Sequence, residues 1–184
     1  MPSTGKTRRG RPSTLLVEAL AFAAHKHRNQ RRKDAEASPY INHPIALARV
    51  LAVEGGVHDE RTLAAAVLHD TVEDTETTVV ELRRHFGRAV AEAVAEVTDD
   101  QSLPKKARKE LQVTRAHSIS RRAKLVKLAD KICNLRDVAT NPPKSWPLRR
   151  RRRYFDWAKR VVDRLRGVNR ALEAAFDRAF ADRP

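Results

Sequence analysis

The chain has 184 residues, of which 41% are hydrophobic and 33% charged, a composition suited to one globular domain. Its formal net charge of +15 favours anionic partners such as nucleotides, nucleic acid or acidic lipid. The single cysteine, Cys133, excludes an internal disulfide and favours a reducing compartment such as the cytoplasm. The apolar stretch 15–24 is interrupted by Glu18 and followed by a basic segment, so we expect neither a signal peptide nor a membrane span.

Apolar spacing and capping residues predict helices along almost the whole chain. Ser13 with Thr14 can cap the first helix, and Asn42 or His43 before Pro44 opens the second. No segment alternates as a strand does, and aromatic residues are few, so the core is expected to consist of Leu, Val, Ala and Ile. The sequence therefore predicts an all-α fold, with helices at about 14–28, 42–53, 59–72, 77–85, 87–97, 105–113, 118–138, 146–165 and 167–181.

Basic residues are densest in two places, at 6–11 and in the run Arg149–Arg153. We expect residues 1–13 to form a flexible basic tail and residues 14–184 to form one domain. Each basic stretch is interpreted either as a solvated surface or as a contact for phosphates, and the charge pattern alone leaves both open.

The stretch AAVLHDTVEDT places His69, Asp70, Glu73 and Asp74 directly behind an apolar run. On a single helix, the pairs at a spacing of four would project from neighbouring stripes of one surface. Imidazole and carboxylate groups suit a divalent ion such as Mn, Fe or Zn, and the remaining carboxylates can orient or deprotonate a water. A capped helix end without a metal is the competing interpretation.

Two further residues strengthen the metal hypothesis. His43 follows the turn in PYINHP, and Asp130 lies in an apolar stretch where an unpaired carboxylate would be costly to bury. Lys127, Lys131 or Arg136 could instead neutralise Asp130 without any metal.

Together these residues give the order H…HD…D. Five stretches accompany this order: HRNQRRKD at 27–34, PYINHP at 39–44, LHDTVEDT at 68–75, EVTDD at 96–100 and KLVKLADKICNLRD at 124–137. With them, the chain resembles the hydrolase domain of the RelA/SpoT alarmone enzymes. The resemblance is closest to the small stand-alone alarmone hydrolases of the metazoan SpoT homologue type and extends over about residues 20–180. It implies a single HD-domain helical bundle.

The resemblance also implies an activity and its residues. The expected reaction is hydrolysis of the 3′-diphosphate of guanosine tetra- or pentaphosphate (ppGpp or pppGpp) to GDP or GTP and pyrophosphate. One Mn²⁺ ion is expected on His43, His69, Asp70 and Asp130, with Glu73 and Asp74 as the catalytic pair. The residues expected near the substrate are Arg32, Lys33, Lys105, Arg108, Asn134, Arg150 and Tyr154. Cys133 departs from the Tyr that is common in such relatives and is expected to alter one pocket wall.

Two other classes of protein compete with this prediction. One is a nucleic-acid-binding protein that uses the basic stretches, although no recognition module or interleaved aromatic residues accompany them. The other is an HD phosphohydrolase acting on a dNTP, a cyclic nucleotide or the 2′-phosphate of NADPH. The sequence leaves the metal ion and the oligomeric state open.

Overall fold

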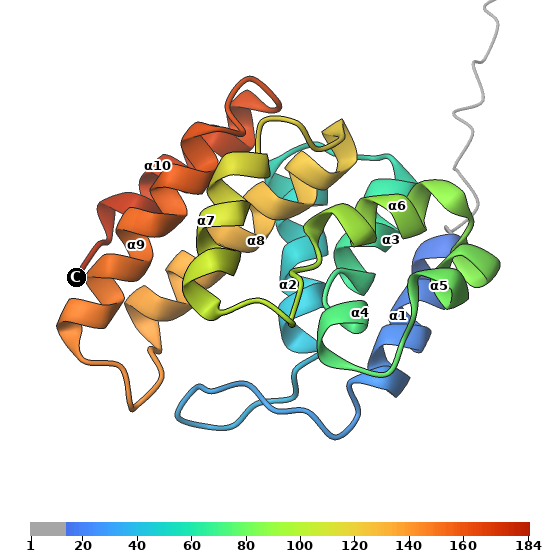
Figure 1. Ribbon diagram of the computed structural model, residues 1–184, viewed down its shortest axis with the longest axis horizontal. Coiled ribbons are helices and arrows are strands. Elements are labelled where there is room, and N and C mark those ends of the chain that lie inside the picture. The colour runs from blue at the N-terminus through green and yellow to red at the C-terminus, as the bar shows by residue number, and fades with distance from the viewer. Residues whose placement is uncertain (1–13) are drawn as a thin grey trace, which may run out of the picture.

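The computed structural model describes residues 14–184, so the predictions for the tail at 1–13 and for the Ser13 cap lie outside the described residues. The described chain folds into α-helices joined by short loops (Figure 1), and its one β-bridge, between Arg31 and Pro39, is isolated. This confirms the all-α prediction. The elements are α1 (Thr14–Lys26), α2 (Asn42–Arg49), the π-helical turn η1 (Val50–Glu54), α3 (Glu60–Leu68), α4 (Thr71–Asp74), α5 (Val79–Phe86), α6 (Arg88–Val97), α7 (Lys105–Arg115), α8 (Arg121–Thr140), α9 (Leu148–Asp163) and α10 (Arg170–Ala181).

Helix α3 forms the centre of the bundle because its sequence is apolar on every side. Every residue from Leu63 to Leu68 is buried, as expected for a helix that is surrounded by others. Asp59 caps its start by accepting a hydrogen bond from the backbone N–H of Thr62 at 3.2 Å. Helices α1, α2, α6 and α8 pack around α3, so the end of α3 lies inside the bundle.

The C-terminal helices close the bundle over α8. Phe155 of α9 and Phe176 of α10 are the largest fully buried side chains, and they belong to a core that otherwise consists mainly of Leu, Val and Ala. Gly55 ends η1 where a Cβ would lie 2.8 Å from Cγ of Leu172, so α10 approaches η1 closely only because this residue is glycine.

One predicted helix was wrong in a way that matters for function. Residues 59–72 do not form one helix, because α3 ends at Leu68 and the separate turn α4 begins at Thr71. Polar side chains replace the missing helical hydrogen bonds: Nδ1 of His69 contacts the carbonyl of Ala66 at 2.8 Å, and the Thr71 hydroxyl donates to that of Leu68 at 2.7 Å. His69 and Asp70 therefore lie at a junction between two helices rather than on a helix face.

The loop that joins α1 to α2 runs along the lower edge of the bundle in the view of Figure 1. Asp34 organises it by accepting hydrogen bonds from the backbone N–H of Ser38 at 3.1 Å and from its hydroxyl at 2.5 Å. The backbone of Arg32 donates to the carbonyl of Ser38 at 2.8 Å, which closes the loop.

Among the described residues, no helix combines the length and apolar character needed to cross a membrane.

Candidate active site

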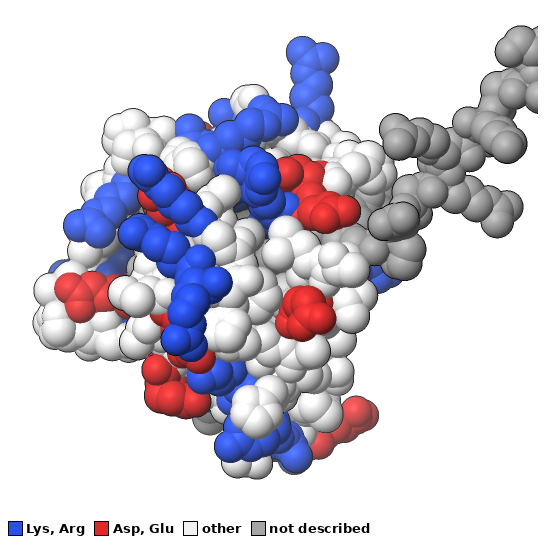
Figure 2. Space-filling model, turned by 90° about the vertical axis from the view of Figure 1, so that its right-hand side faces the viewer, with Lys and Arg blue, Asp and Glu red and all other residues white. Residues whose placement is uncertain are grey.

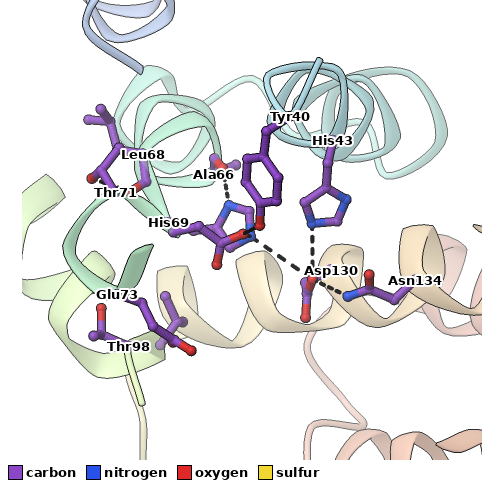
Figure 3. A network of polar contacts seen from close by, with 12 residues as sticks. Tyr40, His43, Ala66, Leu68, His69, Thr71, Glu73, Thr98, Asp130 and Asn134 are labelled. Carbon is purple, nitrogen blue, oxygen red and sulfur yellow. Dashed lines mark hydrogen bonds and ion pairs between the residues drawn. The ribbon is translucent and has the colours of Figure 1, made fainter. Parts of the chain in front are cut away.

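Four side chains from three parts of the fold line one pocket of about 220 Å³. His43 comes from the first turn of α2, His69 from the junction between α3 and α4, and Asp130 from the middle of α8 (Figure 3). Asp70 follows His69 at the same junction. One ligand atom each from His43, His69 and Asp130 lie within 4.8 Å of one another. Asp70 adjoins this group, with its Oδ2 2.8 Å from Nε2 of His69. The structure thus brings together all four residues predicted to bind a metal.

The histidine orientation fits a divalent metal ion. The carbonyl of Ala66 can only accept, so Nδ1 of His69 carries a proton in this contact, and Nε2 is the atom that can bind a metal ion once its own proton is released. Nε2 of His69 is buried and faces the carboxylates of Asp70 and Asp130 at 2.8 and 4.0 Å. Two imidazoles with two carboxylates form a common ligand set for Mn, Fe, Co or Zn.

Asp130 is held by its own helix. Lys131 donates to Oδ2 of Asp130 at 2.9 Å and Asn134 donates to Oδ1 at 2.5 Å. Burial works against ionisation, but Lys131 and then His43 hold the pKa of Asp130 well below its usual range. Of the three cations considered as partners for Asp130, only Lys131 contacts it, because Arg136 pairs with Glu54 at 2.7 Å and Lys127 bonds elsewhere.

The cluster carries a proton that a metal ion would replace. Burial by itself lowers the pKa of His69, but the adjacent Asp70 carboxylate outweighs burial and raises it to about 9. The same contact holds the pKa of Asp70 below its usual range, although burial opposes this. A protonated His69 therefore compensates the two carboxylates in the metal-free chain, and metal binding would release that proton.

Glu73 and Asp74 of α4 also line this pocket. Glu73 is fixed by two donors, the backbone N–H of Asp99 at 2.9 Å and the side-chain amide of Gln101 at 2.8 Å. Burial, together with the neighbouring Asp99 carboxylate, raises the pKa of Glu73 to about 7 even though the backbone hydrogen bond lowers it. Burial and then Asp70 raise the pKa of Asp74. A carboxylate with a pKa near 7 is suited to general-base chemistry.

A larger cleft of about 680 Å³ adjoins the metal-site pocket. Asp74, Arg32, Tyr40, His43 and Asn134 line both spaces, so the cleft leads directly to the cluster. Its other walls are lined by Lys33 from the α1–α2 loop and by Trp146 and Tyr154 from the C-terminal part of the chain. Cations and aromatic rings beside the polar cluster make the cleft suitable for a nucleotide.

The remaining predicted substrate residues lie outside these spaces. Lys105 is exposed, and Arg150 is exposed with its guanidinium 4.3 Å from the centre of the Trp146 ring. Arg108 lines a separate cavity of about 40 Å³ and donates to Oε1 of Gln101, whose amide holds Glu73. Lys and Arg side chains form a band across one face of the molecule, interrupted by separate acidic patches (Figure 2), in keeping with an anionic partner.

Comparisons with known proteins agree with this geometry. The family model of the HD domain matches residues 19–154. The guanosine-3′,5′-bis(diphosphate) 3′-pyrophosphohydrolase MESH1 of Xenopus tropicalis is 54% identical over 92% of this chain and 95% of its own. The human enzyme of the same name is 54% identical over 95% of this chain and 97% of its own. The chain belongs to the HD-domain family and to its MESH1 branch.

A solved structure of this branch supports the assignment. It is described as a metazoan ortholog of SpoT that hydrolyses ppGpp and plays a role in starvation responses. It superimposes with a TM-score of 0.91 at 50% sequence identity, covering 95% of this chain and 98% of the other. The HD-domain fold predicted from the sequence is therefore confirmed, and the family together with the His43, His69 and Asp130 cluster indicates a divalent metal.

The HD-domain site also contains residues that the sequence interpretation did not assign. Tyr40 donates its hydroxyl to Asp70 at 2.5 Å, Asp137 pairs with Arg32, and Trp146 lines the cleft. Tyr40 and Asp137 lie inside the quoted motifs PYINHP and NLRD, where their positions were the available signal. The expectation that Cys133 alters a pocket wall was wrong, because Cys133 is buried and lines none of the cavities described above. Burial raises the pKa of its thiol to about 12.

Proposed function

We propose that this protein hydrolyses the 3′-diphosphate of ppGpp and pppGpp, releasing GDP or GTP and pyrophosphate. The observation that carries this proposal is that the His/Asp pocket opens into a cleft lined by basic and aromatic residues. The chain also matches MESH1 enzymes over nearly its whole length. We further propose that it acts in the cytoplasm, where its free, buried thiol stays reduced, and that removal of ppGpp gives it a role in the stringent response.

We propose Mn²⁺ as the resident metal, held by His43, His69, Asp70 and Asp130. When bound, such an ion polarises a phosphoryl oxygen and lowers the pKa of water from about 15.7 toward 7. The carboxylates Asp70 and Asp130 stay ionised at neutral pH, as the low pKa of each requires, so both remain available as ligands, whereas His69 must release its proton when the metal binds.

Glu73 is proposed to take the proton from the attacking water. Its two oxygens are already oriented by Asp99 and Gln101, and its pKa of about 7 lets it accept a proton near neutral pH. Asp74 lines both the cleft and the metal-site pocket, where it can orient the water against the substrate. The water oxygen bonds to the inner phosphorus of the 3′-diphosphate, and the bond from that phosphorus to the ribose 3′ oxygen breaks. The 3′ oxygen takes up a proton and leaves as the hydroxyl of GDP, which balances the proton given to Glu73.

The cleft is proposed to bind the nucleoside. We propose that Arg32 and Asn134, which line both spaces, hold it next to the cluster, and that Tyr154, whose ring lies beside that of Trp146, forms part of the cleft wall. Arg32 is already oriented by Asp137. Lys33 supplies positive charge inside the cleft, whereas Lys105, Arg108 and Arg150 are proposed to contribute charge from its surroundings.

A product assay on three substrates tests this proposal. Purified, Mn²⁺-loaded protein is incubated separately with ppGpp, NADPH and a dNTP at equal concentration, and the products are separated by ion exchange. We expect GDP from ppGpp with the highest kcat/KM of the three. Turnover of NADPH or the dNTP without turnover of ppGpp would overturn the proposed substrate.

A further inference from the structure

Three cations line the pocket that contains the His/Asp cluster, and two of them have strong partners. Arg32 pairs with Asp137, and Lys131 donates to Asp130 at 2.9 Å. The third is Lys127 of α8, whose ammonium makes one long hydrogen bond of 3.4 Å, to the carbonyl of Val97. Lys127 therefore has donor capacity that the described protein does not use.

The burial of Lys127 makes this unused capacity notable. Only 7% of the residue is exposed, and burial, with the like charge of Lys131, lowers the pKa of its ammonium to about 8. A buried ammonium is costly unless it is paired and hydrogen-bonded. The nearby carboxylates bond to other donors, since Asp99 accepts from Gln112 at 2.8 Å and Glu73 accepts from Gln101 and the backbone of Asp99.

Other unpartnered polar atoms surround the same place. Lys127 and Gln112 line both the metal-site pocket and the cavity of about 40 Å³ behind it, which Arg108 also lines. Oε1 of Gln112 and Nε of Arg108 are buried without hydrogen-bond partners. Buried polar groups in proteins nearly always have a partner, so this side of the pocket is arranged for a ligand or ordered water.

One end of the metal-site pocket opens into the large cleft, and the other end does not. Arg32 and Asn134 are shared with the large cleft, whereas Glu73, Gln112 and Lys127 are not. With the nucleoside in the cleft and the inner 3′ phosphorus at the His/Asp cluster, the part of the pocket left for the outer 3′-phosphate is the end lined by Glu73, Gln112 and Lys127. Neither Lys105 nor Arg108 lines the metal-site pocket.

We propose that Lys127 binds the outer phosphate of the 3′-diphosphate and so favours a diphosphate over a monophosphate on the ribose. This inference rests on the proposed function, because it assigns a residue to one group of that substrate. An ammonium bound to phosphate oxygens gains charge-assisted hydrogen bonds, which would replace the missing partners of Lys127.

The test combines a binding measurement with a stability measurement on Lys127→Met. Pyrophosphate is titrated calorimetrically into Mn²⁺-loaded wild-type protein, Lys127→Met and the control Lys124→Met, which removes a lysine from the same helix that lines none of these cavities. We expect the Kd for pyrophosphate to rise roughly 10- to 100-fold in Lys127→Met, as for loss of a hydrogen bond to a charged group, and to stay unchanged in Lys124→Met. An unchanged Kd in Lys127→Met, or no binding to the wild type, would overturn the inference.

Thermal unfolding separates a ligand-binding role from a structural one. Methionine fills a similar volume without a buried charge, so Lys127→Met should unfold at the same Tm as the wild type or higher. A fall in Tm with no change in pyrophosphate affinity would assign Lys127 a structural role and overturn the proposal.

Kinetics then compares ppGpp with the guanosine nucleotide that carries a 5′-diphosphate and a 3′-monophosphate. We expect the ratio of kcat/KM values, diphosphate over monophosphate, to fall at least 10-fold in Lys127→Met, and an unchanged ratio would contradict the assignment. Absence of ppGpp turnover in the wild type would instead refute the proposed function, and the pyrophosphate titration would still decide whether Lys127 binds this anion.

Discussion

The hydroxyl of Tyr40 donates a hydrogen bond of 2.5 Å to Oδ2 of Asp70. Burial, and then the charge of Asp70, raise the pKa of Tyr40 far above its usual range, so the phenol remains a neutral donor. The ring of Tyr40 also packs 4.9 Å from that of His27, centre to centre. The α1–α2 loop thus fixes the orientation of a proposed metal ligand that follows thirty residues later in the chain.

Tyr40→Phe should weaken metal binding while the fold is kept. Loss of a hydrogen bond to a ligating carboxylate commonly lowers metal affinity about 10- to 100-fold, and we expect that range for Mn²⁺ measured by competition with a chelator. Tyr154→Phe, in a cleft residue outside the cluster, is the matched control and should bind Mn²⁺ normally. Equal affinities in both variants would show that Tyr40 does not orient Asp70.

Asp70→Ala should lose the metal and still fold. The Asp70 side chain is 20% exposed at the edge of the pocket rather than in the apolar core, so its removal should leave the helical circular dichroism spectrum intact. Elemental analysis after gel filtration should find less than a tenth of an equivalent of metal, against about one in Asp100→Ala. A full equivalent in Asp70→Ala would exclude Asp70 as a ligand.

Glu73→Ala and Asp74→Ala should separate chemistry from binding. Loss of a general base typically lowers kcat about 100- to 10,000-fold, and we expect this for Glu73→Ala with the metal content unchanged. Asp74→Ala should also lower kcat, since Asp74 is proposed to orient the water. Turnover at the wild-type rate in both variants would leave the pair with a structural role only.

Stability should depend on pH through Glu73 in the metal-free protein. Its pKa is raised from 4.5 to about 7 in the folded state, so folding favours the protonated form. Between these values the folded state holds a proton that the unfolded chain has released, and the free energy of unfolding falls as the pH rises. Glu73→Gln should therefore raise Tm above that of the wild type more at pH 8 than at pH 5. A Tm difference that is the same at both pH values would contradict this.

The sequence predicted most of the fold because its helices have strong local signals. Ser120, Thr78 and Asn169 each cap a helix by accepting a backbone hydrogen bond, and the predicted helix starts there differ from the observed ones by two or three residues. The break after Leu68 was missed because nothing in AAVLHDTVEDT resembles a helix-ending residue. The side chains of His69 and Thr71 end the helix by bonding to carbonyls within it.

The candidate site was predictable where its residues form a motif in the sequence. His43, His69, Asp70 and Asp130 were found because their order forms a motif, and the structure brings them together. The long-range contacts of the site were not predictable, since the pairing of Arg32 with Asp137 joins residues 105 positions apart. The sequence suggested Lys127 only as a counter-ion for Asp130, because its hydrogen bond to the carbonyl of Val97 depends on how α8 packs against the end of α6.

Phosphorus NMR of ppGpp turnover by the Mn²⁺-loaded protein, run without added pyrophosphatase, tests the central claim most directly. The proposed attack on the inner phosphorus predicts that GDP and pyrophosphate appear together in equal amounts, with no orthophosphate signal at early times. Early appearance of orthophosphate, with a guanosine nucleotide that keeps a single 3′-phosphate, would contradict the account because the outer phosphorus would then be the site of attack.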